Sequence, residues 1–228
     1  MVPSPKRQRS QRPPLTRERV FEAAVSVADA RGVAAVTMRN VAEQLGIEAM
    51  SLYHHVANKD GILDGIVDLV FAQIELPDGE SDWKSAMNRR AASARTVLAR
   101  HPWALGLMES RRNPGPATLR HHDWMIGRLR TAGFPIRLVA HAISAIDAYV
   151  YGFVLQESTL PFNTAEELED VAAGIVEHLP ANGYPHLAEM FEHALRPGYS
   201  YADEFAFGLD LVLDGLERAF AEAGGPPV

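Results

Sequence analysis

The chain has 228 residues, 47% of them hydrophobic and 22% charged, and no cysteine, which is typical of a soluble globular protein and excludes disulfide scaffolds and thiolate metal sites. The net charge is −7, yet residues 1–60 carry nine Lys or Arg against six Asp or Glu, and the acidic excess lies in residues 61–228. This asymmetry indicates a basic module that meets a polyanion, attached to an acidic body.

Nothing in the sequence indicates export or a membrane. The basic N-terminus lacks the apolar stretch of a signal peptide, and the absence of cysteine favours a reducing cytoplasm. No apolar run approaches the roughly 20 residues of a membrane-spanning helix. The longest candidate, 140–155, is interrupted by His141 and Asp147. We therefore expect a cytoplasmic protein that does not enter a membrane.

Residues 1–15 are predicted to form a disordered basic arm, because proline and polar residues dominate them. Within residues 1–20 a single acidic residue, Glu18, faces six basic ones: Lys6, Arg7, Arg9, Arg12, Arg17 and Arg19. The arm would add charge to nucleic-acid binding, or reach into a minor groove.

Four helices are predicted after the arm. Thr16 can cap a helix that ends at Gly32, and Thr37 a short helix that ends at Gly46. A third short helix is expected over 48–56, and Asn58 can cap a fourth over 59–74. Six more are predicted over 83–100, 102–111, 115–132, 135–158, 165–178 and 201–223, separated by Pro, Gly and Asn. No alternating strand pattern occurs, so the chain is predicted to be all-α.

The stretch GIEAMSLYHHVANKD (46–60) gathers a tyrosine, two histidines and a lysine. Neighbouring histidines point about 100° apart on a helix, so they cannot hold one metal ion. His121 and His122 cannot hold one metal ion for the same reason. The sequence also has no motif for nucleophilic catalysis or phosphate binding. We therefore expect no metal, no cofactor and no catalytic site.

The better interpretation of this stretch is a helix-turn-helix, in which the helix after Gly46 enters a DNA groove. Leu52 and Val56 would anchor that helix, and its outward side chains would be Ala49, Met50, Ser51, Tyr53 and His54. The side chains of Tyr53, His55 and Lys59, and Thr37 at a helix N-terminus, suit phosphate oxygens. The alternative is that Tyr53 and His55 only pack the helix.

Residues 16–63 resemble the DNA-binding domain of the tetracycline-repressor (TetR) family, through TRERVFEAAVSVADARG, TMRNVAEQLGI and LYHHVANKDGIL. The C-terminal part resembles the tetracycline repressors themselves, through SDW, HPWALGLM, AGF, YGFVLQES and FGLDLVLDGLE. The resemblance implies an arm (1–15), a three-helix DNA-binding domain (16–60), a larger helical ligand-binding and dimerisation domain (61–223) and a flexible tail (224–228).

The resemblance also implies roles for single residues. Thr37, Tyr53, His55 and Lys59 would hold the DNA backbone, and Arg39, Ala49, Met50, Ser51 and His54 would lie near base edges. Arg39 is the expected direct reader, because arginine pairs with guanine through two hydrogen bonds.

In the body, the resemblance implies an inducer pocket and a homodimer. The last helix has an apolar stripe that is predicted to meet a partner, or else to be buried in a monomer: Phe205, Leu209, Val212, Leu216 and Phe220. The predicted ligand contacts, which could also be plain core, are Arg90, Trp103, Met108, Trp124, Met125, Tyr149, Phe153 and Gln156.

The sequence departs from the tetracycline repressors at the pocket. Met108 falls where that family has a magnesium-binding histidine, and Gln156 falls where a glutamate helps to hold the metal's water. Because methionine does not bind a hard cation, we expect an inducer that is mostly apolar and bound without metal. The resulting hypothesis is a repressor that this inducer releases from a palindromic operator. The alternatives are a helical enzyme and a regulator controlled by a protein partner.

Overall fold

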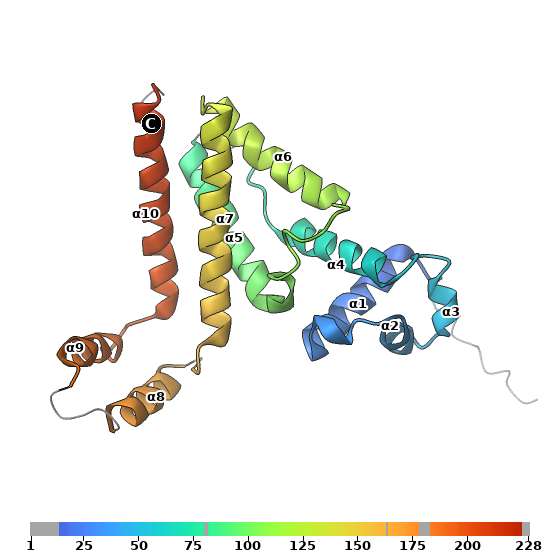
Figure 1. Ribbon diagram of the computed structural model, residues 1–228, viewed down its shortest axis with the longest axis horizontal. Helices are drawn as coiled ribbons and strands as arrows, with labels where there is room; N and C mark the ends of the chain where they lie inside the picture. Colours follow the sequence, from blue (N-terminus) through green and yellow to red (C-terminus); the bar gives the residue numbers. More distant parts are fainter. Residues whose placement is uncertain (1–13, 80–81, 163, 178–182, 225–228) are drawn as a thin grey trace, which may run out of the picture.

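The computed structural model describes residues 14–79, 82–162, 164–177 and 183–224 (Figure 1). Within these ranges the chain forms ten α-helices and two short 3-10 helices, and no strand. The prediction of an all-α fold is confirmed. Most of the predicted arm and most of the predicted tail lie outside the described residues.

The N-terminal helices are α1 (Arg17–Arg31), α2 (Met38–Leu45) and α3 (Ala49–Leu52). The hydroxyl oxygen of Thr16 accepts the N–H of Arg19 at 3.3 Å, and that of Thr37 accepts the N–H of Asn40 at 3.1 Å. Both threonines are therefore the predicted N-caps. Gly46 has a φ of 65°, which lets the chain turn sharply from α2 into α3 without the strain that a Cβ would bring.

Helix α4 (Lys59–Gln73) belongs to two hydrophobic cores. Ile62 and Ile66 pack into the N-terminal core with α1, α2 and α3, whereas Val70 and Phe71 pack into the larger core of the body. The predicted domain border at residue 60 thus lies at the start of a helix that both units share. The ring of Phe21 fills the space beside Gly65, which brings α1 close to α4. A displacement of α4 would therefore move α1 with it.

The larger core is built from α5 (Trp83–Arg100), α6 (Pro116–Thr131), α7 (Ile136–Thr159) and α10 (Tyr201–Glu222). Helix α7 packs against α5, α6 and α10. At one end of this core the rings of Phe134 and Phe220 stack with their centroids 4.1 Å apart, and Trp83 meets Phe134 edge-on at 4.8 Å. These rings tie α5 and α10 to the turn between α6 and α7.

Helices α8 (Ala165–Glu177) and α9 (Pro185–Ala194) lie beside the ends of α7 and α10, on the side of the body remote from α1–α3 (Figure 1). Helix α9 has no buried residue, and Leu187 and Met190 expose large apolar side chains. Together α8 and α9 extend the body away from the N-terminal helices.

Three predicted segments differ from the structure. The helix expected over 48–56 ends at Leu52, because the chain continues in turns in which the N–H groups of both His55 and Val56 donate to the carbonyl of Leu52. The helix expected over 102–111 is a 3-10 turn, Pro102–Ala104, followed by turns. Helix α9 was missed, because its flanking prolines were interpreted as breaks, whereas Pro185 occupies the first helical turn.

Helix α7 is long and apolar enough to span a membrane by length and composition, with a mean hydropathy of 1.6. This differs from the expectation that no apolar run approaches the length of a membrane-spanning helix. Its Asp147 is buried and paired with a buried arginine of α5, and its other contacts join three helices of the body. These contacts are those of the central helix of a protein core.

Candidate nucleic-acid interface and ligand cavity

Helix α3 places different side chains on its two faces. Leu52 and Val56, just beyond the helix, are buried in the N-terminal core, as the sequence predicts. Met50 and Tyr53 are 73% and 50% exposed, and His54 is exposed beside them. Because most large apolar side chains of this unit are buried, the exposed Met50 and Tyr53 mark a surface available for contact.

The other predicted DNA contacts surround this surface. Thr37 and Arg39 lie at the start of α2, Arg39 exposed and Thr37 half-buried, and α2 packs against α3. The hydroxyl oxygen of Thr37 is occupied by the Asn40 N–H, which leaves its hydrogen free to donate. His55 and Lys59 follow α3, and Ala49 and Ser51 are half-buried within it. All nine predicted residues thus reach the surface on consecutive segments.

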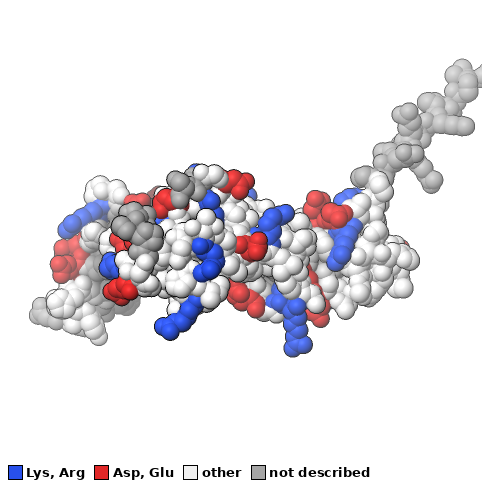
Figure 2. Space-filling view, turned by 90° about the horizontal axis from the view of Figure 1, so that it is seen from above, with Lys and Arg blue, Asp and Glu red and all other residues white. Residues whose placement is uncertain are grey.

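The described residues of the N-terminal unit carry little net charge. Figure 2 shows Lys and Arg interspersed with Asp and Glu over one face of the whole molecule, without a broad patch of one sign. The most basic segment predicted from the sequence, which contains Lys6, Arg7, Arg9 and Arg12, lies outside the described residues. Residues 14–60 carry five Lys or Arg against six Asp or Glu, so the described part of this unit is distinguished by the type of its exposed side chains and not by an excess of positive charge.

The eight predicted ligand contacts do not converge on one cavity. Arg90, Met108, Met125 and Phe153 are buried in the core. The other four have different surroundings: Trp103 donates to Asp29 at 2.6 Å, Tyr149 donates to backbone carbonyls of α10, Gln156 is exposed, and Trp124 is half-buried beside Arg128. Of these, Tyr149 lies against Phe153, with ring centroids 6.1 Å apart. Large side chains suit cavity walls, but half of these eight are buried in the core.

A groove of about 670 Å³ lies instead between α6 and α7. One face of α7 provides most of its wall, and the lining residues are Glu109, His122, Ile126, Ile136, Val139, Ala140, Ile143, Ser144, Asp147, Ala148 and Tyr151. A smaller cavity of about 180 Å³, which Met108 lines, shares Glu109 and His122 with it. The volume, the apolar walls and the few polar groups are typical of a small-molecule site. The period of α7 could have revealed this face, since its lining residues recur at helical spacing.

A buried polar network lies behind the groove. Arg90, fully buried, donates from Nη1 to Oδ1 of Asp147 at 2.6 Å and from Nε to Nε2 of His121 at 3.0 Å. Burial, aided by the charge of Arg90, lowers the pKa of His121 to about 2, so its ring is neutral. Burial also raises the pKa of Tyr151, whose hydroxyl donates to Glu109 at 3.2 Å. The network joins α5, α6 and α7 at the floor of the groove.

The segment after Glu109 is tied to α4 by an acidic ladder, which consists of Asp60, Asp64 and Asp68 at successive turns of that helix. Arg111 donates to Asp64 at 2.7 Å and contacts Asp60 at 3.3 Å. The hydroxyl and N–H of Thr118, at the start of α6, both donate to Asp68. Because Glu109 lines the groove and α4 reaches the N-terminal core, the ladder connects the groove mechanically to α1–α3.

A second connection joins the two units at α1. His101, after α5, contacts Asp29 through Nδ1 at 2.7 Å, and the indole N–H of Trp103 donates to the same carboxylate oxygen. Trp103 and Leu107 also pack against the N-terminal core. Predicted as a ligand contact, Trp103 is thus a link between the body and α1.

The predicted dimer stripe of α10 is turned inward for the most part. Phe205, Leu209, Leu216 and Phe220 are buried in the protomer, and Val212 is half-buried. They pack on α5 and α7, so a partner cannot reach the four buried side chains as the helix lies. The exposed apolar side chains of α10 are Phe207 and Leu211, at 65% and 56% exposure.

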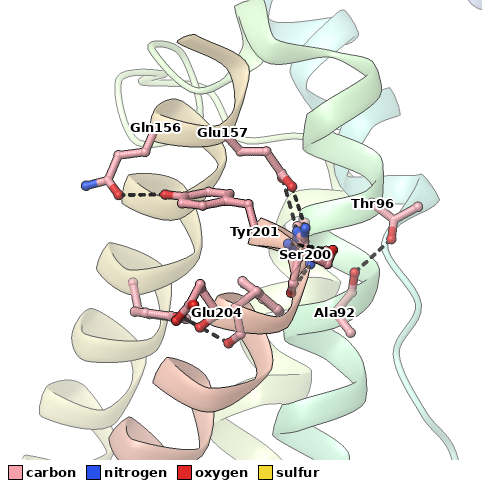
Figure 3. Close-up of polar contacts among 11 residues, drawn as sticks. Ala92, Thr96, Gln156, Glu157, Ser200, Tyr201 and Glu204 are labelled. Carbon is pink, nitrogen blue, oxygen red and sulfur yellow. Dashed lines mark hydrogen bonds and ion pairs between the residues drawn. The ribbon is translucent and has the colours of Figure 1, made fainter. Parts of the chain in front are cut away.

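Polar contacts fix the junction of α10 with α5 and α7 (Figure 3). The hydroxyl of Tyr201 donates to Gln156 of α7 at 3.2 Å, and Glu157 receives Arg95 of α5. The guanidinium of Arg95 also lies over the rings of Phe153 and Phe205. These contacts assign Gln156 and Phe153 to the packing of α7 on α10. Among the described residues, no three His, Asp or Glu are grouped so that they could hold a metal ion.

Comparison with known proteins covers nearly the whole chain. Residues 20–66 match the family described as bacterial regulatory proteins, tetR family, and residues 76–220 match the tetracyclin repressor-like C-terminal domain. The HTH-type transcriptional repressor DrrR1 of Streptomyces coeruleorubidus is 35% identical, over 95% of this chain and 83% of that protein. The class C tetracycline repressor protein of Escherichia coli is 26% identical, over 90% of this chain and 91% of that one.

Solved structures agree with the sequence relatives. The ActR protein of Streptomyces coelicolor, in complex with actinorhodin, superimposes with a TM-score of 0.74 at 26% identity, over 94% of this chain and 98% of that one. Apo ActR gives a TM-score of 0.76 over 93% of this chain and 99% of that one.

Proposed function

The chain belongs to the tetR family of bacterial transcription regulators, and from this premise we propose that it is a homodimeric repressor that a small, mostly apolar molecule releases from a palindromic operator. The observation that carries the proposal is the α3 surface, whose Met50, Tyr53 and His54 are exposed above a buried anchor at the position that the family uses for DNA. Because a bacterial regulator must reach DNA, the protein is proposed to work in the cytoplasm.

For DNA, we propose that residues 16–60 with the first half of α4 form the binding unit. Thr37, Tyr53, His55 and Lys59 would hold phosphates, while Arg39, Ala49, Met50, Ser51 and His54 would lie near bases. The arm would add positive charge. Two α3 helices related by two-fold symmetry would fit half-sites about one helical turn apart.

For dimerisation, we propose the exposed faces of α7 and α10. Phe207 and Leu211 are exposed on α10, and Leu155 is 56% exposed on α7, to which α10 packs. On the same side of α7, small residues such as Ala145 and Gly152 would let a second pair of helices approach closely. Large exposed apolar side chains on adjacent helices are typical of an interface between copies.

For regulation, we propose that the groove between α6 and α7 holds the inducer and that the acidic ladder transmits its presence. A ligand that contacts Glu109 would displace the segment from Glu109 to Thr118, and with it Arg111 and α4. Because Phe21 packs on Gly65, α1 would follow α4 and change the distance between the two α3 helices. A ligand acts in this way only by binding one arrangement more tightly than the other.

Two other functions compete with this one. An enzyme would need a nucleophile or an acid–base pair at the groove, and Asp147 and Glu109 are already engaged by Arg90 and Tyr151. A regulator controlled by a protein partner would leave the groove without a small ligand. Neither alternative accounts for an apolar groove whose bordering segment is joined to α4 by the ion pairs of Arg111 and the hydrogen bonds of Thr118.

The test is a DNA mobility-shift selection with the purified protein on fragments of its source genome, followed by footprinting of the bound fragment. The proposal expects a protected near-palindrome, bound by two protomers, and uniform loss of binding in Lys59→Ala. Binding without sequence preference, or protection of a single half-site, would overturn it.

A further inference from the structure

The polar groups of the groove between α6 and α7 are gathered at one end and are mostly acceptors. Glu109 and Asp147 present carboxylates there, while no Lys or Arg occurs among its described lining residues. Tyr151 stands one turn after Asp147 on α7, and its hydroxyl donates to Glu109. This contact brings the two carboxylates to the same end of the groove.

The nearest buried cation is not available to a ligand. Arg90 is fully buried, and its donors go to Asp147 and to His121. Asp147 receives Arg90 on Oδ1, and a carboxylate can accept further hydrogen bonds. In the smaller neighbouring cavity, Arg111 is held by the acidic ladder. An anionic ligand would therefore meet two carboxylates without a free basic partner.

The rest of the groove has the opposite character. Its walls are aliphatic side chains such as Ile126, Ile136 and Ile143, which favour an apolar ligand body. The rings of Tyr151 and His122 border the acidic end, and an aromatic face attracts a cation. The groove thus combines an apolar wall with an electronegative end.

We propose that this groove binds an apolar organic cation, with its ammonium group beside Glu109, Asp147 and Tyr151. The proposal deepens the regulatory function proposed above and rests on it for the consequence of binding, but not for binding itself. At the acidic end of the groove, the carboxylate of Asp147 is buried and the carboxylate of Glu109 is exposed. Glu109 is therefore a specificity-determining residue that can be replaced without disturbing the core.

The test uses three probes with the same tricyclic body: anthracenylmethylamine, anthracenylmethanol and anthracenecarboxylate. Their affinities for the full-length protein without DNA are measured by calorimetry at low salt. We expect the ammonium probe to bind at least about tenfold more tightly than the carboxylate, with the alcohol between them, since opposite charges attract and like charges repel at this range.

A pair of matched variants locates the effect. Glu109→Gln should reduce the preference for ammonium over carboxylate by about threefold or more, because Arg90 offsets the charge of Asp147, whereas Glu109 receives only a neutral hydroxyl from Tyr151. Glu75→Gln, an exposed glutamate outside the groove, should leave the preference unchanged. Equal reduction by both variants would mean that general surface charge, and not the groove, sets the preference.

Other results would overturn the proposal. Equal binding of alcohol and ammonium, or tighter binding of the carboxylate, would show that the acidic end does not select a cation. Absence of binding for every probe also overturns it. If Ile126→Glu then weakens the dimer in light scattering, the occupant of the groove is a second copy of the chain.

Failure of this inference can be distinguished from failure of the proposed function. Binding of the ammonium probe without release of DNA would support the ligand assignment and count against regulation through the groove. Operator binding in the absence of any probe binding would count against the ligand assignment alone.

Discussion

Replacing Asp147 by alanine should destabilise the body strongly, because it leaves the buried Arg90 without its counter-charge. Arg90 has no exposed surface, Asp147 is 6% exposed, and their charged atoms are 2.6 Å apart. Removing one partner of a buried ion pair costs about 3–5 kcal/mol of the free energy of unfolding. His121 still accepts hydrogen bonds from Arg90, but as a neutral ring it cannot replace the lost charge.

The loss can be measured by urea unfolding at constant protein concentration, since dimerisation would couple stability to concentration. With a slope of about 2 kcal/mol per molar urea, a loss of about 4 kcal/mol lowers the midpoint by about 2 M. The control is Lys84→Met, which removes two partly exposed ion pairs, with Asp214 and Glu217, and should cost about 1 kcal/mol or less.

A double variant separates charge burial from packing. Arg90→Met combined with Asp147→Leu removes both charges, and it should recover much of the stability that Asp147→Ala loses. A midpoint for Asp147→Ala within about 0.3 M of the parent protein would refute the reasoning, because the slope would then convert to less than about 1 kcal/mol.

Three further changes test stability, DNA recognition and assembly, and a fourth tests coupling. His121 binds a proton in the unfolded chain below about pH 6.5 but stays neutral when folded, so the free energy of unfolding should fall as the pH drops, by about 2 kcal/mol at pH 5. In urea titrations at several pH values, His121→Gln should flatten this dependence on pH. Arg39→Ala should relax preference at one base pair by about 1–3 kcal/mol, whereas Lys59→Ala should weaken all operator variants alike in mobility-shift assays; an unchanged ranking with Arg39→Ala would assign that residue to phosphate. Phe207→Glu should yield folded monomers with poor operator affinity, and a variant still dimeric in light scattering would move the interface elsewhere. Arg111→Gln should keep operator binding but weaken release by an inducer, and unaltered release would remove the acidic ladder from the mechanism.

The fold could be predicted from sequence largely because its helix ends have clear local signals. Thr16, Thr37 and Asn58 each precede an apolar periodic segment, and each is an N-cap in the structure. Gly46 ends α2 in the left-handed conformation that glycine favours. Helix α9 was missed because proline both interrupts and begins helices, and the surrounding sequence does not decide between them.

The groove proposed to hold a ligand did not follow from the sequence, for a reason of packing. Large side chains such as Met125 and Phe153 were expected to line a cavity, but both are buried in the core. The groove is lined instead by one face of α7, which mixes Ile136 and Ile143 with smaller residues such as Ala140 and Ala148. Local sequence patterns also do not predict ion pairs between residues far apart in the chain, such as Arg90 and Asp147.

The most direct test of the account is footprinting of the operator in the presence and absence of an inducer, with the stoichiometry measured on the same samples. The account predicts two protomers on a near-palindrome, and both half-sites lose protection together when the groove is filled. In the Arg111→Gln variant, both half-sites should stay protected in the presence of the inducer. Deprotection of one half-site alone, or release that Arg111→Gln and substitutions in the groove leave unaltered, would contradict it.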